Sequence, residues 1–211
     1  VGHEVAGTVV KAGEKVNRLK VGDRVTVLPM HTCGTCEWCK QDLPAHCAKR
    51  YMPGQDPWIG ACVEYLNVPQ ELCYILPDDV STKLGALCEP LAVAVHALRK
   101  IPEDRRDSVL MMGAGAIGHL AVIAAKGMGF KRVIVSDIVD QNLEMALENG
   151  ADFAVNVSRE DLPTALEKKY GEKVSSIIIT AGPKDILKQA IAAIKRTGYI
   201  IAITMTDGEL P

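Results

Sequence analysis

The chain has 211 residues, of which 48% are hydrophobic and 24% are charged, and its formal net charge is -2. This balance is that of a globular protein with one or two domains, and it includes no basic excess for binding nucleic acid. No apolar run approaches the roughly 20 residues that cross a bilayer. We therefore expect neither a nucleic-acid nor a membrane partner. Because the sequence starts at Val1 and stops at Pro211 just after a strand-like run, we interpret it as an internal segment of a longer protein.

Short strand-like runs broken by Gly and Pro dominate residues 1–95, where few windows show helical periodicity. Apolar and β-branched runs bounded by turn residues are typical of strands. The Gly22-Asp23 pair ahead of one run is typical of a tight turn. We predict a β-rich unit that carries a cysteine-bearing loop. Its expected strands are Val5–Val10, Arg24–Leu28, Val63–Val68 and Cys73–Leu76.

Four cysteines inside this unit follow the spacing C-x2-C-x2-C-x7-C. They are Cys33, Cys36, Cys39 and Cys47. Four thiolates this close in sequence can surround one Zn²⁺ tetrahedrally and leave no position for water, which predicts a structural zinc site. The odd total of 7 cysteines favours metal binding in a reducing compartment, the cytoplasm, over disulfides. The isolated Cys62 and Cys73 are expected to be small buried residues.

A helical pattern extends from Thr82 to Lys100, and strands and helices alternate after it. Alternation of apolar strands with helices implies a parallel sheet that is covered on both faces. The expected strands are Val109–Met112, Val133–Asp137, Phe153–Val157, Ser176–Thr180 and Tyr199–Thr204. The expected helices are Ile117–Met128, Gln141–Asn149, Leu162–Tyr170 and Ile186–Lys195.

A G-x-G-x-x-G motif lies between the first of these strands and the helix that follows. It consists of Gly113, Ala114, Gly115, Ala116, Ile117 and Gly118. In a strand-turn-helix context, Gly113 permits the tight turn, Gly115 lets a pyrophosphate approach the backbone, and Gly118 lets the helix pack closely on the sheet. The amides at the start of the helix then face the phosphates. The motif predicts a dinucleotide site.

Asp137 ends the second of these strands, 19 residues after Gly118. A carboxylate there accepts hydrogen bonds from the adenosine ribose and repels a 2′-phosphate. No Arg or Lys follows nearby to hold such a phosphate, so the sequence favours NAD(H) over NADP(H). The alternative is that Asp137 is the N-cap residue of a helix.

His3 and Glu4 stand at the head of the first strand-like run. Neutral imidazole is a frequent zinc ligand, and an adjacent carboxylate either binds the metal or orients the other ligands. A His-Glu pair by itself is more often a surface feature, so these two residues alone leave the choice open.

The motifs in their order resemble the zinc-dependent medium-chain dehydrogenase/reductase family over the whole chain. They are Gly2–Gly7, Gly22–Val25, the four cysteines, Glu89–His96, and Gly113–Gly118 followed by Asp137. The Glu89-Pro90-Leu91 stretch most resembles the sorbitol (polyol) dehydrogenase branch. The resemblance implies an α/β chain with a partial GroES-like zinc-binding domain over residues 1–95, including a structural-zinc lobe at 33–47. It also implies a partial NAD-binding Rossmann domain, a doubly wound parallel sheet, over residues 96–211.

By the same resemblance, His3, Glu4 and Glu89 bind the catalytic zinc, the two glutamates either directly or in exchange with water. Cys88 is the weaker alternative to Glu89. A further cysteine ligand and a hydroxyl residue that starts the proton relay would fall before Val1. Members of the family often have a basic residue near the adenosine where Asn142 stands, a departure that bears on the grip on the cofactor and not on its identity. The stretch Gly60–Tyr65 departs from the commoner pattern and is expected to border the substrate pocket, which leaves the substrate open.

The resemblance implies an enzyme that transfers a hydride from a secondary alcohol to NAD⁺, giving a ketone, with zinc as the Lewis acid. Its substrate would be a small polyol, sugar alcohol or related diol, and the full-length protein would be a homo-oligomer. The alternatives are a threonine, butanediol or sugar-acid dehydrogenase of the same family, a zinc-free reductase, and a zinc ribbon that binds nucleic acid.

Overall fold

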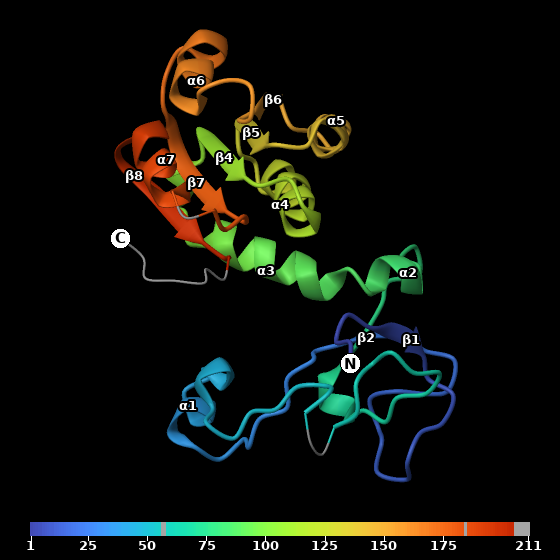
Figure 1. Cartoon of the computed structure of the whole chain (residues 1–211). Helices are drawn as coiled ribbons and strands as arrows, with labels where there is room; N and C mark the ends of the chain where they lie inside the picture. Colours follow the sequence, from blue (N-terminus) through green and yellow to red (C-terminus); the bar gives the residue numbers. More distant parts are fainter. Residues whose placement is uncertain (56–57, 184, 205–211) are drawn as a thin grey trace. The chain divides into compact units, whose positions relative to one another are not determined.

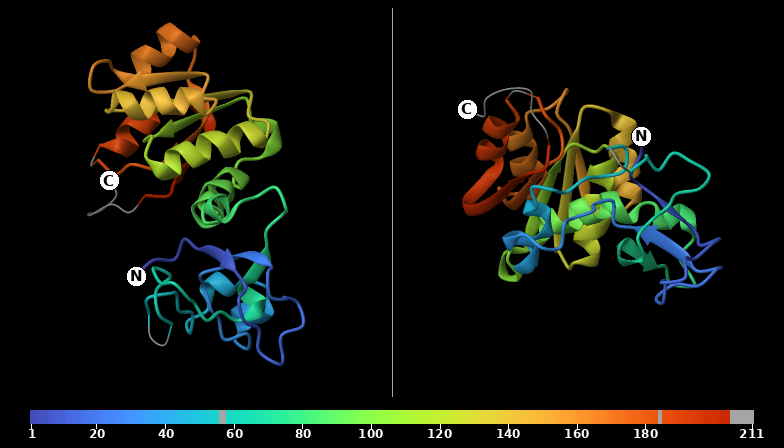
Figure 2. Two further views of the ribbon diagram at one scale, coloured as in Figure 1. Left: turned by 90° about the vertical axis from the view of Figure 1, so that its right-hand side faces the viewer. Right: turned by 90° about the horizontal axis from the view of Figure 1, so that it is seen from below.

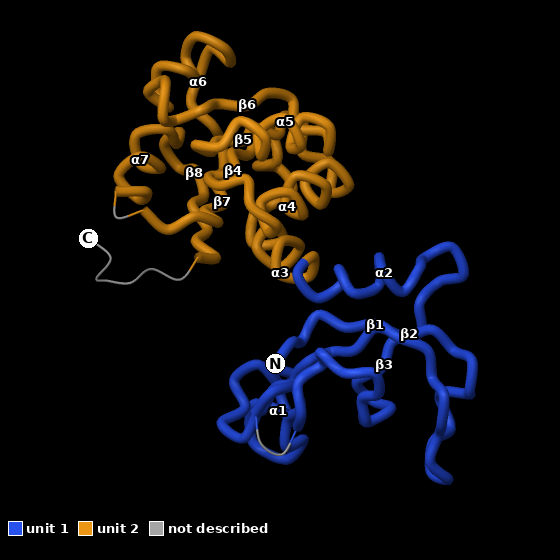
Figure 3. Tube along the Cα trace, turned by 45° about the vertical axis from the view of Figure 1, so that its right-hand side comes forward, with its two compact units in different colours: residues 1–90 blue, residues 91–211 orange. Residues whose placement is uncertain are grey.

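The computed structural model describes residues 1–55, 58–183 and 185–204. The chain divides into two compact units, Val1–Pro90 and Leu91–Pro211 (Figures 1 and 3). Each unit has its own sheet, and the two are described separately below. Within the described ranges, none of the helices has the length and apolarity that a bilayer crossing requires.

The sheet of the first unit has three short antiparallel strands in the order β1-β2-β3. They are β1 (Ala6–Thr8), β2 (Arg24–Val27) and β3 (Cys73–Ile75). The remaining elements are single turns: α1 (Glu37–Lys40), η1 (Pro44–His46), η2 (Gln70–Leu72) and α2 (Thr82–Gly85). The buried core is small and consists of Val25, Val27, Trp58 and Cys73.

The predicted strand at Val63–Val68 is wrong, because these residues form no ladder within the described part of the chain. Together with the segment 5–13, they line a cavity of about 970 Å³. A strand is stabilised by hydrogen bonds to a neighbouring strand, and within the described residues no strand pairs with this stretch. Cys62, at the edge of the same stretch, is exposed, whereas the sequence predicted burial.

The predicted helix from Thr82 to Lys100 is two helices, α2 and α3 (Cys88–Arg99). Ser81 caps α2, its Oγ accepting a hydrogen bond from the Leu84 amide at 3.2 Å. Pro90 has no amide hydrogen and is tolerated only in the first turn of a helix. A new helix therefore starts just before Pro90, and the periodic apolar pattern did not show this break.

The sheet of the second unit is five-stranded and parallel, in the order β6-β5-β4-β7-β8. Its strands are β4 (Ser108–Met112), β5 (Arg132–Asp137), β6 (Phe153–Asn156), β7 (Val174–Ile179) and β8 (Ile194–Ala202). Its other elements, besides most of α3, are η3 (Glu103–Arg105), α4 (Ala116–Gly127), α5 (Asp140–Glu148), α6 (Leu162–Tyr170) and α7 (Ile186–Ala193). This is the predicted doubly wound arrangement.

Alternate residues of the central strand face opposite core layers, since successive side chains of a strand point to opposite sides. Val109 and Met111 pack with α3, α4 and α5, whereas Leu110 and Met112 pack with α6 and α7. Figure 2 shows the two sets of helices on opposite sides of the sheet. All four side chains are at most 1% exposed, as expected for a parallel sheet covered on both faces.

The predicted helix Ile186–Lys195 ends two residues early, at Ala193, and β8 begins at once with Ile194. Ile194 pairs with Val174, and the ladder shifts register before it resumes between Ser176 and Tyr199. The strand therefore starts earlier than the expected Tyr199. This pairing partner is remote in sequence, so the helical periodicity of the segment did not reveal it.

Candidate functional site

The structure brings the four cysteines of the C-x2-C-x2-C-x7-C motif together. Their Sγ atoms all lie within 4.8 Å of one another. Three of the Sγ–Sγ distances are 3.5 Å (Cys36–Cys39), 3.6 Å (Cys47–Cys33) and 4.0 Å (Cys33–Cys39). Tetrahedral sulfur ligands at the usual zinc–sulfur bond length lie about 3.8 Å apart. The cluster therefore has the dimensions of a four-thiolate zinc site.

Local structure gathers these thiols. Helix α1 is a single turn that places Cys36, its N-cap residue, on the same side as Cys39 three positions later. The 3-10 turn η1 ends at His46, directly before Cys47, which is 0% exposed. The other three cysteines are partly exposed, and four thiolates together fill every position of a tetrahedral zinc ion. The arrangement is that of a structural site rather than one with an open position.

Proton affinity is divided unevenly among these thiols. Hydrogen bonds from the backbone amides of Thr35 and Cys36, with further help from neighbouring side chains, lower the pKa of Cys33 to about 5. Burial, followed by the hydrogen bond with Cys36, raises the pKa of Cys39 to about 11. Adjacent thiolates repel one another, so the four ionise together only when a cation neutralises them. The donor set thus fits a divalent metal.

His3 and Glu89 also meet, at an Nε2–Oε2 distance of 3.9 Å. His3 precedes β1, in a segment held by hydrogen bonds from the Ala61 amide to Gly2 O and from the Cys62 amide to Val1 O. Glu89 belongs to the first turn of α3, and its side chain is 20% exposed. One imidazole and one carboxylate, 86 positions apart in sequence, are thereby placed within reach of a single ion.

Glu4 is exposed and does not join this pair. In the part of the chain that the structure describes, the only group of three or more metal-ligating side chains is the four-cysteine cluster. The sequence-based hypothesis that His3, Glu4 and Glu89 act as one set is therefore matched by the geometry only for His3 and Glu89.

The glycine motif forms a tight turn between β4 and α4. Gly113 has a φ of +110°, a backbone conformation that residues with a Cβ rarely adopt. A Cβ on Gly118 would stand 2.2 Å from the carbonyl oxygen of Gly113, so only glycine lets α4 come this close to the loop. Gly115 has open space where a Cβ would be. Ala116 and Ile117 begin α4, and the first amides of a helix have no partner within the helix, so they are free to bind an anion.

Asp137 is hydrogen-bonded directly to this loop. Its Oδ2 accepts a hydrogen bond from the Ala114 amide at 2.6 Å, and its Oδ1 accepts from the amides of Ile138 and Val139 at 2.8 and 2.9 Å. Helix α5 has Val139 as its N-cap residue and no side-chain cap, so the alternative role for Asp137 as an N-cap does not apply. The carboxylate lies beside the phosphate-binding turn, where an adenosine ribose would be held.

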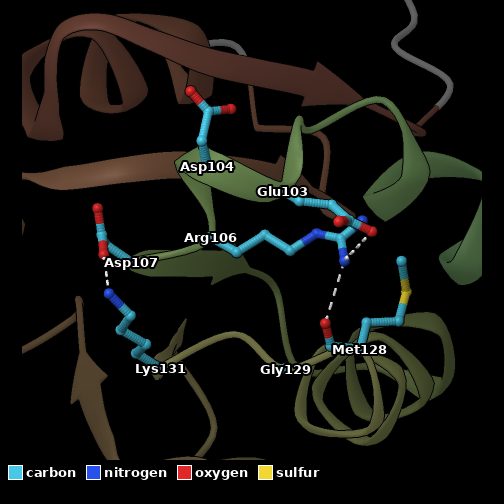
Figure 4. A pocket seen from close by; sticks show the side chains of 7 residues that line it. All are labelled: Glu103, Asp104, Arg106, Asp107, Met128, Gly129 and Lys131. Atoms are coloured by element: carbon cyan, nitrogen blue, oxygen red, sulfur yellow. Dashed lines mark hydrogen bonds and ion pairs between the residues drawn. The ribbon is translucent and has the colours of Figure 1, made fainter.

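A further pocket of about 380 Å³ opens in the second unit (Figure 4). Its lining includes Asp107 and Lys131, each of which directly precedes a strand, and Arg106. Asp107 and Lys131 form an ion pair at 2.7 Å, and Arg106 pairs with Glu103 at 3.6 Å. Because Gly113 and Asp137 lie at the opposite ends of these strands, this pocket is not the dinucleotide site.

Comparisons with known proteins agree with this geometry. The model of the alcohol dehydrogenase GroES-like domain matches residues 1–78, and that of the zinc-binding dehydrogenase matches residues 116–211. Sorbitol dehydrogenase of Bombyx mori is 34% identical over 100% of this chain and 62% of its own length. The Bos taurus sorbitol dehydrogenase is 35% identical over 96% of this chain and 58% of its own length.

Two solved structures give TM-scores of 0.90. An alcohol dehydrogenase from Escherichia coli CFT073, complexed with NADH, is 32% identical, and the match covers 100% of this chain and 62% of that one. A zinc-binding dehydrogenase from Sinorhizobium meliloti 1021, bound to NADP, is 30% identical, with coverages of 98% and 61%.

The chain therefore belongs to the zinc-dependent medium-chain dehydrogenase/reductase family, as the motifs predicted, and the predicted GroES-like and Rossmann folds are confirmed. Within the family it resembles the sorbitol dehydrogenase branch. The chain spans 62% and 60% of the length of the first two of these curated relatives. The predicted cofactors, Zn²⁺ and NAD, are those that the family and the thiol cluster support.

Sequence analysis missed three polar residues near Asp137. They are Asp140, Asn156 and Arg159, which hydrogen-bond to one another where β5 and β6 end. No motif marks them. Their contact depends on the pairing of β5 with β6, which brings Arg159 close to the turn after Asp137 although it is distant from Asp137 in sequence.

Proposed function

We propose that the chain is part of a zinc-dependent oxidoreductase that transfers a hydride from a secondary alcohol to NAD⁺, giving a ketone. The substrate would be a polyol, a sugar alcohol or a related diol. The observation that carries this proposal is the hydrogen bond from the Ala114 amide, in the glycine turn, to the Asp137 carboxylate. Sorbitol dehydrogenases from several organisms among the relatives support the substrate class.

The second unit would bind the cofactor. Amides at the start of α4 would donate to the pyrophosphate, which the open space at Gly115 admits. Asp137 would accept hydrogen bonds from the ribose hydroxyls, and the three amides that already donate to it hold its carboxylate in place. In this proposal residues 96–211 form the NAD-binding domain, and residues 1–95 form the GroES-like catalytic domain.

The first unit would hold two zinc ions. His3 and Glu89, with Glu4 directly or through water, would hold the catalytic one, and imidazole and carboxylate are donors that zinc accepts. A zinc ion bound there would act as a Lewis acid and lower the pKa of the substrate hydroxyl. Cys33, Cys36, Cys39 and Cys47 would hold the structural ion. The complete protein would be a cytoplasmic homo-oligomer.

The test is oxidation of sorbitol, L-idonate and 2,3-butanediol by the full-length protein with NAD⁺, together with NADH binding measured by fluorescence and zinc content. His3→Ala should abolish oxidation while NADH binding persists, and Asp137→Ala should weaken NADH binding. His96→Ala, an exposed histidine on α3, is the matched control and should leave both unchanged. Full activity of the His3 variant, or of protein from which zinc has verifiably been removed, would contradict the proposal.

A further inference from the structure

Asp140, Asn156 and Arg159 join the turn after β5 to the end of β6. Asn156 and Asp137 are direct partners in the ladder between these strands. The Nδ2 of Asn156 donates to Oδ1 of Asp140 at 2.6 Å and to the carbonyl oxygen of Ile138 at 3.3 Å. Asn156 is only 8% exposed, so these two hydrogen bonds connect the turn to the buried end of β6. The first residues after Asp137 are thus fixed to the neighbouring strand.

Arg159 completes the network from the outside. Its guanidinium donates to Oδ2 of Asp140, so both carboxylate oxygens of Asp140 are engaged. The side chain of Arg159 is 68% exposed and that of Asp140 is 48% exposed. Two residues before Arg159, the Val157 amide donates to the carbonyl oxygen of Asp137 at 3.0 Å. A cationic side chain therefore lies near the ribose-binding turn, although it is remote from that turn in sequence.

A cation in this position matters for the choice between two cofactors. A dinucleotide with a 2′-phosphate needs a positive charge near the adenosine ribose, and arginine is the side chain that best matches a phosphate. Arg159 is such a group, but it is bound to Asp140. The hydrogen bond from Asn156, and then the ion pair with Arg159, lower the pKa of Asp140, so its carboxylate stays charged at neutral pH.

We propose that Asp140 is a second determinant of cofactor choice, because it binds Arg159 and so keeps this guanidinium from a 2′-phosphate. Asp140 also adds negative charge three positions after Asp137. The inference rests on the proposed function, in which Asp137 binds the ribose of NAD. Exposed ion pairs contribute little to folding, so loss of the ion pair itself costs little stability, and Asn156 keeps its hydrogen bond to the carbonyl oxygen of Ile138 when Asp140 is replaced. Cofactor preference would then be set in part by a residue that need not touch NAD.

The experiment measures NADH and NADPH dissociation constants by fluorescence titration for the full-length protein and three variants. Asp140→Ala should tighten NADPH binding roughly three- to tenfold, the effect of one freed exposed cation and one lost repulsion, and change NADH binding less than about twofold. Asp140→Ala/Arg159→Ala should lose most of that gain. Glu144→Ala removes an exposed carboxylate further along α5 and is the matched control, expected to leave the NADPH/NADH ratio unchanged.

Two results would overturn the inference. The first is an unchanged NADPH/NADH ratio in the Asp140 variant, and the second is a gain that survives in the double variant, which would assign the effect to lost repulsion alone. Failure of the unsubstituted chain to bind NADH would instead refute the proposed cofactor role, and with it this inference. Thermal melts of each variant separate changes in the ratio from loss of fold.

Discussion

The two units are stabilised by different means. The first has strands of three or four residues, and its core cluster contains four buried side chains among the residues that the structure describes. The second has five paired strands covered on both faces, with central residues that are at most 1% exposed. Apolar burial is the main source of folding free energy, so the first unit gains much less free energy from burial than the second. The unit with the small core also carries the thiol cluster, and in small domains a bound metal often supplies folding free energy that burial does not.

Removal of zinc should produce the largest difference between the units. Structural zinc contributes on the order of 10 kcal/mol to the folding of small zinc modules. Chelation, or Cys39→Ser, should therefore expose the amides of residues 33–47 to rapid hydrogen exchange and leave β4 to β7 protected. Cys62→Ser is the control, because Cys62 lies outside the cluster. Equal loss of protection in both units would show that the metal does not act locally.

A cavity in the core of the second unit should have the next largest effect, on the free energy of unfolding. Ile178 is 0% exposed on β7. Its replacement by Ala should lower the free energy of unfolding by about 2–5 kcal/mol, because the lost methyl groups leave a cavity. Urea titration measures this. Ile191→Ala on α7, where the side chain is 60% exposed, should change stability by less than about 0.5 kcal/mol. Zinc content should not change in either variant, and a loss of zinc would show that the units are coupled.

Crowding at the glycine turn should have a moderate effect. In Gly118→Ala the new Cβ would meet the Gly113 carbonyl oxygen at 2.2 Å. Separating α4 from the loop should cost about 1–3 kcal/mol and weaken NADH binding. Gly127→Ala, at the other end of α4, meets nothing within 4 Å and should be neutral or slightly stabilising. Unaltered NADH affinity and stability in the Gly118 variant would argue against this packing role.

The smallest expected effect is a pH dependence in the second unit. Although burial raises the pKa of Asp152, hydrogen bonds from Lys126 and the Val133 amide outweigh it and lower the pKa below its ordinary value. A carboxyl group with a lowered folded-state pKa stabilises the fold above its unfolded pKa, about 3.9, and loses this effect as pH falls. Asp152→Asn should therefore be less stable by about 1 kcal/mol at pH 7, and the difference should shrink below about pH 4.

Thermal melts between pH 3 and pH 7 follow this difference. Asp161→Asn is a useful comparison, since Asp161 caps α6 and its pKa is also lowered, by hydrogen bonds from the Thr164 hydroxyl and amide. A stability difference between the Asp152 variant and the unsubstituted chain that stays constant over this range would contradict the assignment.

Local patterns predicted the second unit well and the first unit less well. In the second unit the strands β4 to β7 are short, largely apolar runs, so strand and helix periodicities distinguish these elements, whereas β8 has the polar residues Lys195 and Arg196 near its beginning and starts earlier than predicted. In the first unit the run Val63–Val68 has the composition of a strand but borders a cavity. Strand formation depends on a partner, and local composition carries no information about where that partner lies.

The candidate sites divide in the same way. The spacing of Cys33, Cys36, Cys39 and Cys47 and the glycine motif are local, so the sequence alone determined the thiol cluster, the phosphate turn and the family. Three other contacts join residues that are distant in the chain. They are the contact of His3 with Glu89, the hydrogen bond from the Ala114 amide to Asp137, and the ion pair of Asp140 with Arg159. These contacts follow from the tertiary fold, because strand order and helix packing, rather than spacing in the sequence, set the distance between such residues.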